Sequence, residues 1–499
     1  MQHDTYTTCT SIFGVRLNIA ITAYEGRKLY CADAINAYTQ AGPFSKRTYL
    51  KEWWWGDAKF HTNIPVGSLL EILSSLQGHH ESGPNWQRKC NKALYMLGYR
   101  SPLHEPCLYR RDRGLDDSGE QLPDTLMSRQ IDDMLFAVHS KDEFDTAVNE
   151  LKLHMDIEGE KELATHYNGI EIEQRREYIA IKVAVYIEKL CDNHGWKNMN
   201  FSKSKPSAPL TEAMAKAIIA SGKGPPLKSA EGLKLEEEKG FGYRVLLGEL
   251  IFACVVCRLD IAYSLSLLAR YAEYPLELHY DGVKGVAKYL RETKDKPIIY
   301  WRRESLMDLP PGDFVPYDIT EDPYRLHADA DSSHATDLET RRSTGGHVLF
   351  LFASAVLWLS KLQATCALSS TESEFMQAVI CAKGVKYGRH VLDGIERTQK
   401  GPSPIREDNM AAIMMINQQR PTKRTRHIDT QWFAIQEWKE RGDIILQYIN
   451  TKDNSADGFT KALGRLLHGK CSNKAMGLYG SPYTFGKYKI PRENDKPSG

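Results

Sequence analysis

The stretch His327-Ala328-Asp329-Ala330-Asp331 closes an apolar-flanked segment on two carboxylates, and three further acidic settings follow it in the last third of the chain. They are Glu374 in S-S-T-E-S-E-F-M, Asp408 in E-D-N and Asp457 in N-S-A-D-G-F-T-K. Mg²⁺ prefers hard oxygen ligands and is shared among carboxylates, water and phosphate. Two such ions roughly 4 Å apart stabilise the attacking and the leaving oxygen of a phosphodiester. Residues 325–465 also alternate strand-like and helix-like segments, so the pattern predicts a two-metal enzyme on an α/β fold.

The bulk composition limits what the rest of the chain can be. A length of 499 residues predicts about three domains. A hydrophobic content of 42% and a charged content of 26% are ordinary for globular proteins. The formal net charge of +1 excludes a globally basic nucleic-acid binder, so contacts to nucleic acid must come from local patches. The clearest patch is R-P-T-K-R-T-R-H at residues 420–427, for which a solvated loop is an equal alternative.

Cysteine use and hydropathy predict an intracellular protein, in the cytoplasm or the nucleus, that does not enter a membrane. The ten cysteines are scattered, and no basic-then-apolar leader opens the sequence. Cys254 and Cys257 lack the second pair that a zinc site needs, so we expect buried thiols. The longest apolar run, Val348 to Leu359, is too short to span a bilayer. Small residues near its middle predict two buried strands joined by a turn.

Three stretches are typical of connections between domains or of a disordered end. Residues 218–240 are rich in Lys, Glu, Gly and Pro, and residues 304–324 carry Pro310-Pro311-Gly312 and several acids. The tail from residue 491 onward is expected to be disordered. Residues 10–200 mix short strands with helices, and residues 241–300 are predicted to be mostly helical.

A second group of acids lies in the first half of the chain. Asp132 and Asp133 fall at the expected turn of a hairpin in Q-I-D-D-M-L-F-A-V. Adjacent carboxylates repel each other unless solvent or cations surround them. Asp33 follows an apolar strand in C-A-D-A-I-N-A-Y. Together the three acids are suited to the metals of a nucleotidyl transferase, which neutralise triphosphate charge, although a polar hairpin turn is the simpler interpretation of Asp132 and Asp133 alone.

These motifs, in this order, resemble the reverse transcriptase–ribonuclease H region of Ty1/copia-type LTR retrotransposon polyproteins. The resemblance extends over most of the chain. Its blocks are A-D-A-I-N-A-Y (32–38), L-Q-G-H (76–79), E-P-C-L-Y (105–109), Q-I-D-D-M-L (130–135), Y-N-G-I-E-I (167–172), Y-R-V-L-L-G-E-L (243–250), R-L-D-I-A-Y (258–263), R-R-S-T-G-G-H-V-L-F (341–350), A-L-S-S-T-E-S-E-F (367–375), R-T-R-H-I-D (424–429) and S-A-D-G-F-T-K (455–461).

The resemblance implies an α+β reverse-transcriptase palm, a helical thumb or connection region, and an α/β ribonuclease H-like domain with a mixed sheet. The implied ranges are 1–200, 201–310 and 320–480, followed by a tail at 481–499. In the palm, Asp33, Asp132 and Asp133 are expected to bind metal. Tyr38 is expected to exclude a 2′-hydroxyl, Gln77 to lie near the incoming nucleotide, and Gly169 to lie in the strand that grips the primer. For these last three, simple packing or a backbone bulge is the structural alternative.

Three departures from the family pattern lead us to expect an impaired polymerase. Gln130 stands where the family carries a tyrosine. The segment K-E-W-W-W-G-D-A-K-F-H-T-N at residues 51–63 matches the family poorly, and three consecutive tryptophans force a large ring into solvent. Asp33 lies so close to the start that the basic strand of the fingers is expected to be missing.

For the nuclease, the resemblance implies Asp329, Glu374, Asp408 and Asp457 as metal ligands. Asp331 is the alternative to Asp329, and on a strand it points to the same side. Glu372 and Glu374 do not share a helix face, so Glu372 is left for the helix start. We expect Asn409 to begin the helix after Asp408, and Asp457 to open the last helix. Candidate contacts to the phosphates of the hybrid are Arg341, Arg342, Lys423, Arg424, Arg426 and His427.

The expected function is hydrolysis of RNA in RNA–DNA hybrids, with two Mg²⁺ or Mn²⁺ ions in each active site. RNA template and DNA primer are the expected partners of the polymerase part. RNA is distinguished from DNA through its 2′-hydroxyls. The alternative hypothesis is a non-catalytic transposon relic that at most binds nucleic acid.

Overall fold

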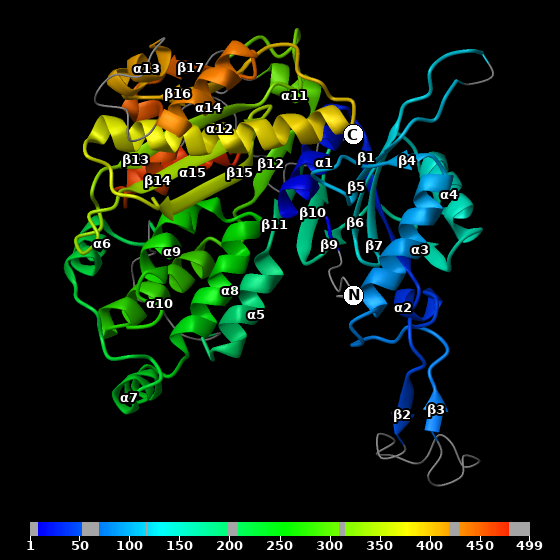
Figure 1. The fold of residues 1–499 in the computed structure, drawn as a ribbon, viewed down its shortest axis with the longest axis horizontal. Coiled ribbons are helices and arrows are strands. Elements are labelled where there is room, and N and C mark those ends of the chain that lie inside the picture. The colour runs from blue at the N-terminus through cyan, green and yellow to red at the C-terminus, as the bar shows by residue number, and fades with distance from the viewer. Residues whose placement is uncertain are drawn as a thin grey trace, which may run out of the picture. The chain divides into compact units, whose positions relative to one another are not determined.

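The computed structural model describes residues 8–51, 69–115, 118–196, 208–308, 315–418 and 429–478. It is a mixed α/β structure with several sheets (Figure 1). The chain divides into two compact units: Met1–Asn18 with Arg27–Asn168, and Ile19–Gly26 with Gly169–Gly499. The boundaries predicted at residues 200 and 310–320 therefore fall within the span of the second unit. Helix α1 (Ile12–Tyr24) contributes residues to both units.

The first unit is built on a six-stranded sheet. Its strands, in sheet order, are β4 (Tyr99–Arg100), β5 (Leu108–Arg111), β6 (Thr125–Gln130), β7 (Asp133–Val138), β1 (Lys28–Ala34) and β8 (Ile157–Gly159). The unit also holds the short ribbon β2 (Tyr49–Lys51) with β3 (Leu69–Glu71), and α2 (Ala37–Gln40) and β9 (His166–Tyr167). Helices α3 (Ser82–Met96) and α4 (Lys141–Lys152) bury their apolar residues against the sheet, with Trp86 and Phe144 at the centre of that core.

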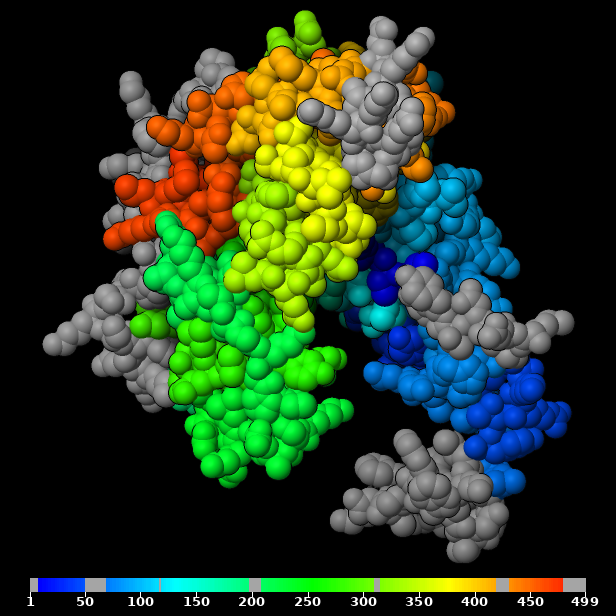
Figure 2. All heavy atoms as spheres, turned by 60° about the vertical axis from the view of Figure 1, so that its left-hand side comes forward, coloured from blue at the N-terminus to red at the C-terminus, as the bar shows by residue number. Residues whose placement is uncertain are grey.

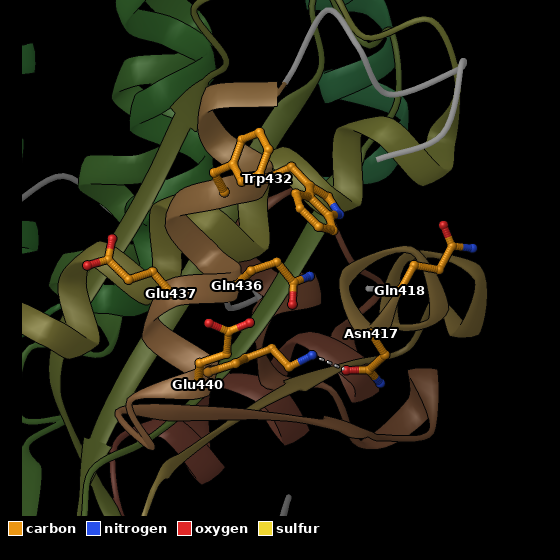
Figure 3. Close-up of a pocket in the computed structure, with 8 residues that line it drawn as sticks. Asn417, Gln418, Trp432, Gln436, Glu437 and Glu440 are labelled. Atoms are coloured by element: carbon orange, nitrogen blue, oxygen red, sulfur yellow. Dashed lines mark hydrogen bonds between the residues drawn. The ribbon is translucent and has the colours of Figure 1, made fainter. Parts of the chain in front are cut away.

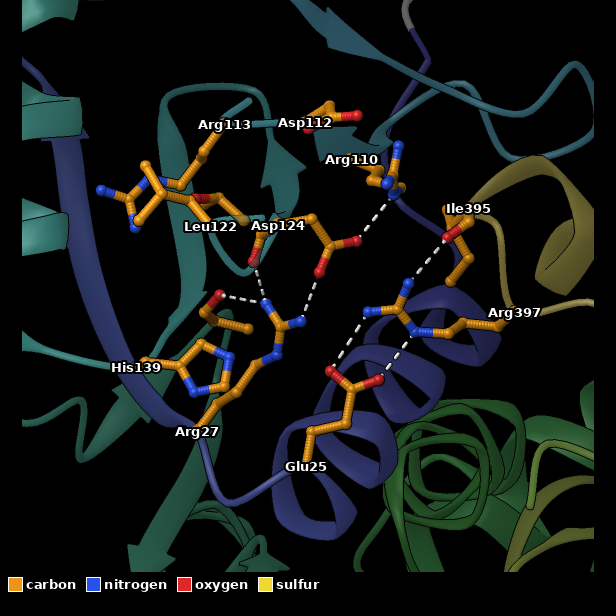
Figure 4. Close-up of polar contacts among 12 residues, drawn as sticks. Glu25, Arg27, Arg110, Asp112, Arg113, Leu122, Asp124, His139, Ile395 and Arg397 are labelled. Carbon is orange, nitrogen blue, oxygen red and sulfur yellow. Dashed lines mark hydrogen bonds and ion pairs between the residues drawn. The ribbon is translucent and has the colours of Figure 1, made fainter. Parts of the chain in front are cut away.

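A helix cap and a buried ion pair stabilise the first unit. Ser140 caps α4, because its side chain accepts a hydrogen bond from the backbone nitrogen of Glu143 at 3.1 Å. The buried carboxylate of Asp124 pairs with Arg27 and with Arg110, as Figure 4 shows. A buried carboxylate is stable only when such partners compensate its lost hydration.

The second unit begins with helices and a small antiparallel sheet in which β10 (Ile170–Gln174), β11 (Tyr178–Lys182) and β12 (Ile298–Trp301) are neighbours. Its helices are α5 (Ala184–Asn193), α6 (Glu212–Ala220), α7 (Ala230–Lys239), α8 (Tyr243–Val256), the 3₁₀ turn η2 (Leu259–Ile261), α9 (Ala262–Ala269), α10 (Glu277–Glu292) and α11 (Arg303–Met307). The stretch 218–240, predicted to be a connection, thus contains helix α7. Ser229 caps its start and Gly240, at φ 74°, ends it.

A mixed five-stranded sheet forms the rest of the second unit. Its order is β15 (Ser354–Leu362), β14 (Thr344–Leu351), β13 (His327–Ser333), β16 (Ser403–Glu407) and β17 (Ile444–Tyr448), and β13, β16 and β17 are parallel. The long helix α12 (Ser370–Gly394) lies across this sheet (Figure 1). The remaining elements are α13 (Met410–Asn417), α14 (Asp429–Glu440), the 3₁₀ turns η4 (Thr451–Asp453) and η5 (Ser455–Phe459), and α15 (Arg465–Ala475).

One buried ionic network joins the helices to the end of the sheet-bearing part. Asp260 accepts hydrogen bonds from Arg258 Nη2 at 2.8 Å and from the Tyr289 hydroxyl at 2.7 Å, and neither Arg258 nor Asp260 exposes its side chain. His468 of α15 lies with its Nε2 2.9 Å from the Asp260 carbonyl oxygen. The green helical residues adjoin the yellow and red residues of the sheet-bearing part in Figure 2. The motif R-L-D-I-A-Y thus has a structural role.

Residues 19–26 pack on the far-off C-terminal part of the sequence. The Tyr24 ring stacks on Phe352 with centroids 4.2 Å apart. The Glu25 carboxylate accepts hydrogen bonds from Arg397 Nε at 2.7 Å and from Arg397 Nη2 at 3.1 Å (Figure 4). This bidentate pair has little exposed surface, which makes it stronger than an ordinary surface ion pair.

Several local predictions are confirmed. The hairpin at residues 130–138 forms between β6 and β7, and the apolar run at 348–359 forms β14 and β15 with a turn at Phe352 and Ala353. Cys254 and Cys257 are buried cysteines, as expected. The W-W-W segment and the tail lie outside the described residues. Among the helices that the structure describes, none is long and apolar enough to cross a membrane.

Gly346 gives a test of how tightly the sheet is packed. A Cβ atom at this position would lie 2.5 Å from Cβ of Phe459, so Gly346→Ala forces η5 away from β14. We expect a loss of about 1–3 kcal/mol in the free energy of unfolding, measured by denaturant titration. Gly248 in α8 is the control, because no heavy atom lies within 4 Å of its Cβ position. Gly248→Ala should stabilise by about 0.5–1 kcal/mol, and equal effects of both changes would contradict the packing argument.

Two buried histidines make stability depend on pH. Burial lowers the pKa of His279 and of His347 to about 4. Above the ordinary pKa of 6.5, the two imidazole rings are neutral in both the folded and the unfolded protein. Between pH 6.5 and 4, they are protonated in the unfolded chain but stay neutral in the folded one. Stability is therefore lost as pH falls from 6.5 toward 4, by about 2 kcal/mol per histidine between pH 7.5 and 5. In denaturant titrations His279→Asn should reduce this loss; an unchanged pH dependence would refute the assignment.

Candidate metal site

Three carboxylates from three separate elements converge in the second unit. Oxygen atoms of Asp331, Glu374 and Asp408 all lie within 4.8 Å of one another. Asp331 lies near the end of β13, Glu374 in the first turns of α12, and Asp408 directly after β16. Asp331 and Glu374 are buried and Asp408 is partly exposed. The cluster is therefore open on the side of Asp408.

The structure places Asp329 outside this cluster and Asp331 in it, in the reverse of the roles expected from the sequence. Asp329 is fully buried, and its Oδ1 accepts a hydrogen bond from Arg406 Nε at 2.5 Å. Its Oδ2 accepts one from the backbone nitrogen of Ser455 at 3.1 Å. The physical reason is register: in the parallel pair β13–β16, Asp329 lies opposite Arg406. Counting two residues on from this pair leads to Asp331 and to Asp408, the first residue after β16.

Local capping fixes the other acids. The Ser369 hydroxyl accepts from the backbone nitrogen of Glu372, and the Glu372 carboxylate accepts from the backbone nitrogen of Leu368 at 2.9 Å. Glu372 thus belongs to the helix start and Glu374 to the cluster. Asn409 caps α13 by accepting from the backbone nitrogen of Ala412 at 3.1 Å, as expected.

Asp457 lies in the 3₁₀ turn η5, and the last helix, α15, begins only at Arg465. The expectation that Asp457 opens the last helix is therefore wrong. Its side chain is buried, and the nearby carboxylate of Asp408 adds to burial in raising its pKa. Asp457 thus belongs to the same acidic environment as the three clustered residues.

The electrostatics of the cluster favour cations. Burial, followed by the carboxylates of Glu407, Asp331 and Asp408, raises the pKa of Glu374. Burial, followed by the carboxylates of Asp457 and Asp408, raises the pKa of Asp331, and burial, followed by the carboxylates of Asp331 and Asp408, raises the pKa of Glu407. Glu374 Oε2 is buried and has no hydrogen-bond partner among the described residues. Hard carboxylate oxygens at this spacing, one of them without a donor, fit a divalent ion such as Mg²⁺ or Mn²⁺.

Two adjacent residues after η5 contact the acids, and neither was expected from the sequence. The Thr460 hydroxyl donates a hydrogen bond to Asp331 Oδ2. Lys461 Nζ lies 2.8 Å from Asp457 Oδ1. Burial works against the charge of Lys461, but the carboxylates of Asp331, Asp457 and Asp408 raise the pKa of its ammonium. The only signal was their place in S-A-D-G-F-T-K, three and four residues after Asp457.

The acids of the first unit lie on two neighbouring strands and the turn beside them. In the antiparallel pair β1–β7, Asp33 lies directly opposite Asp133, and Asp132 occupies the two-residue turn before β7. Burial, then the carboxylates of Asp132 and Asp33, raises the pKa of Asp133 to about 6. Asp33 is exposed, and burial followed by Asp132 raises its pKa. This group is therefore more solvated than the cluster of the second unit.

The turn that carries Asp132 has a strained backbone, and two side chains hold it in place by hydrogen bonds. Ile131 has φ 57°, a left-handed conformation that β-branched residues rarely adopt. Its carbonyl oxygen accepts hydrogen bonds from Trp86 Nε1 at 2.8 Å and from Arg129 Nη1 at 3.1 Å. Strain of this kind persists only where surrounding contacts impose it. Trp86 and Arg129 thus position the acidic turn, a role that the sequence did not reveal.

The remaining candidates are scattered. Tyr38 is half-buried at the edge of the first unit's core, close enough for Asp132 to add to burial in raising its pKa. Gln77 is exposed in a turn. Gly169 has φ 76° and lies in the turn before β10 rather than in a strand. Arg341 and Arg342 are exposed before β14. Lys423, Arg424, Arg426 and His427 lie outside the described residues.

A large open hollow lies away from the acids. It has a volume of about 750 Å³ between the end of α13 and α14, and Figure 3 shows the residues that line it, Trp432 and Gln436 among them. None of the clustered acids borders it, so volume alone does not locate the chemistry. Pockets of this size can be mere surface relief, and the converging carboxylates are the more specific signal.

Comparison with known proteins gives the chain its relatives. No protein-family model matches it. The retrovirus-related Pol polyprotein from transposon TNT 1-94 of Nicotiana tabacum is 25% identical over 405 residues, covering 80% of this chain and 27% of that polyprotein. The corresponding polyprotein from transposon RE1 of Arabidopsis thaliana is 21% identical over 462 residues, covering 93% of this chain and 28% of its own length. The chain belongs to the Ty1/copia-type retrotransposon polyproteins.

A shorter protein is also similar to this chain. The putative transposon Ty5-1 protein of Saccharomyces cerevisiae is 24% identical over 317 residues, which are 62% of this chain and 87% of that protein. By contrast, the chain spans little more than a quarter of the tobacco and Arabidopsis polyproteins. The family resemblance expected from the motifs is confirmed.

Proposed function

We propose that the second unit of this Ty1/copia-type chain is a ribonuclease H that hydrolyses the RNA strand of RNA–DNA hybrids. The observation that carries the proposal is the convergence of Asp331, Glu374 and Asp408, with oxygens within 4.8 Å of one another. Asp457 is the fourth expected ligand, and Asp331 replaces Asp329. The names of the relatives, Pol polyproteins of transposons, support a nucleic-acid substrate.

The residues of the chain have distinct roles in this mechanism. Bound Mg²⁺ or Mn²⁺ ions would activate the attacking water and stabilise charge on the leaving oxygen. Asp331, Glu374 and Asp408 would hold the ions, and Thr460 orients Asp331 through its hydrogen bond. Arg406 and Asp329 hold β13 and β16 in register, which keeps Asp331 close to Asp408. Metal binding must also expel protons from these acids, because burial and mutual repulsion raise their pKa values.

A matched pair of substitutions tests this assignment. With Mg²⁺ and a labelled RNA–DNA hybrid, Asp331→Asn should lower the cleavage rate at least about 100-fold, because a metal ligand is lost. The variant should still fold. Asp329→Asn should instead lower the free energy of unfolding by about 3–5 kcal/mol, because it leaves Arg406 buried without its partner.

The comparison also covers the alternative of a non-catalytic relic. Wild-type protein that binds the hybrid without cutting it would favour that alternative. Full cleavage by Asp331→Asn, together with lost cleavage by a folded Asp329→Asn, would restore the role first expected for Asp329.

We propose RNA-directed DNA synthesis by the first unit as a second candidate function, which the register of Asp33 against Asp133 favours. With a primed RNA template, Asp133→Asn should abolish extension. Because the pKa of Asp133 is raised to about 6, extension by the wild type should fall as the pH drops through 6. Asp145→Asn, in an exposed pair with Lys141, is the control. Extension that survives Asp133→Asn would exclude this site as its source.

A further inference from the structure

Lys461 brings a positive charge into the acid cluster of the second unit. It follows η5 and reaches back four residues, so that its Nζ lies 2.8 Å from Asp457 Oδ1. The preceding residue, Thr460, bonds Asp331. The pair Thr460-Lys461 therefore contacts two of the four proposed ligands from one short segment.

This contact differs from an ordinary surface ion pair. Exposed pairs contribute little, since water screens both charges. Here the Lys461 side chain is 43% exposed while that of Asp457 is only 3% exposed. The Lys461 ammonium therefore approaches from the solvent side and neutralises the buried carboxylate of Asp457. A buried carboxylate without such a partner is costly.

We propose that Lys461 is a built-in counter-ion that occupies a cation position beside Asp457 until a divalent metal displaces it. The proposal rests on the metal site of the proposed function. A metal ion and an ammonium cannot both lie against the same carboxylate oxygen without repelling each other. Metal binding at Asp457 must therefore move Lys461 outward, and this requirement weakens one metal position relative to the other. In the metal-free protein, Lys461 has the opposite effect and stabilises the packed acids.

Metal affinity and metal-free stability together test this role. The full chain carries Asp133→Asn, so that the first unit's acids contribute less, and Mn²⁺ is titrated calorimetrically. Lys461→Met should bind Mn²⁺ about tenfold more tightly, since the competing charge is gone. In EDTA, the same variant should melt at a lower temperature. Lys461→Arg keeps the charge and should retain an affinity close to that of the starting protein.

Lys470→Met is the matched control. Lys470 Nζ lies 2.6 Å from Asp453 Oδ1, in a lysine–aspartate pair of the same region that involves none of the clustered acids. Its replacement should leave Mn²⁺ affinity unchanged. If Lys461→Met proves unstable, Lys461→Gln provides the same loss of charge on a polar side chain.

The outcomes separate this inference from the proposed function. If Asp331→Asn removes Mn²⁺ binding while Lys461→Met leaves the affinity unchanged or lowers it, the counter-ion role alone is overturned. Absence of Mn²⁺ binding to the second unit, with Asp331→Asn behaving like its parent, overturns the metal site and the counter-ion role together. Tighter binding in Lys461→Met alone, with loss of metal-free stability, supports both.

Discussion

The carboxylate of Asp260 is the constraint on which the second unit depends. Burial opposes its ionisation, but Arg258 and Lys296 hold the pKa of Asp260 well below its usual range. Tyr289 completes the set from α10, and His468 reaches the Asp260 backbone from α15. Breaking a buried pair of this kind typically costs about 3–5 kcal/mol, since the surviving charge keeps no partner. The helical region and the sheet that carries the acids therefore form one compact body, although their sequences suggested two domains.

Pattern and periodicity were sufficient wherever neighbours in sequence decide the structure. The β6–β7 hairpin and the β14–β15 hairpin follow from alternation and turn residues, and Asn409 follows from helix capping. The choice between Asp329 and Asp331 was different, because both lie on one side of β13. It depended on which residue of β16 stands opposite, and that register is a long-range property. Helix α7 is the exception among the local features: its composition is that of a connection, although Ser229 and Gly240 mark its two ends.

The two acidic sites solve the same electrostatic problem in different ways. In the first unit, Asp132 and Asp133 lie on a hairpin and Asp33 on the neighbouring strand β1, near solvent, and water moderates their repulsion. Trp86 and Arg129 hold the Ile131–Asp132 turn in place through hydrogen bonds to the Ile131 carbonyl oxygen. In the second unit, Asp331, Glu374 and Asp457 are buried, so that charge balance must come from the protein or from bound cations. The protein responds to this need in three ways. The pKa of Glu374 is raised, Thr460 donates a hydrogen bond to Asp331, and the ammonium of Lys461 lies beside Asp457.

The packing of residues 19–26 has a consequence for how this chain can be divided. These eight residues precede the whole six-stranded sheet, yet they belong to the second unit. A fragment that starts at residue 169 would lack the Glu25 partner of Arg397 and would expose the face of Phe352 that Tyr24 covers. The second unit is thus a discontinuous fold, interrupted by the first much as a host domain is interrupted by an insert. Truncation at the apparent boundary would therefore remove residues 19–24 of helix α1, which belong to the second unit.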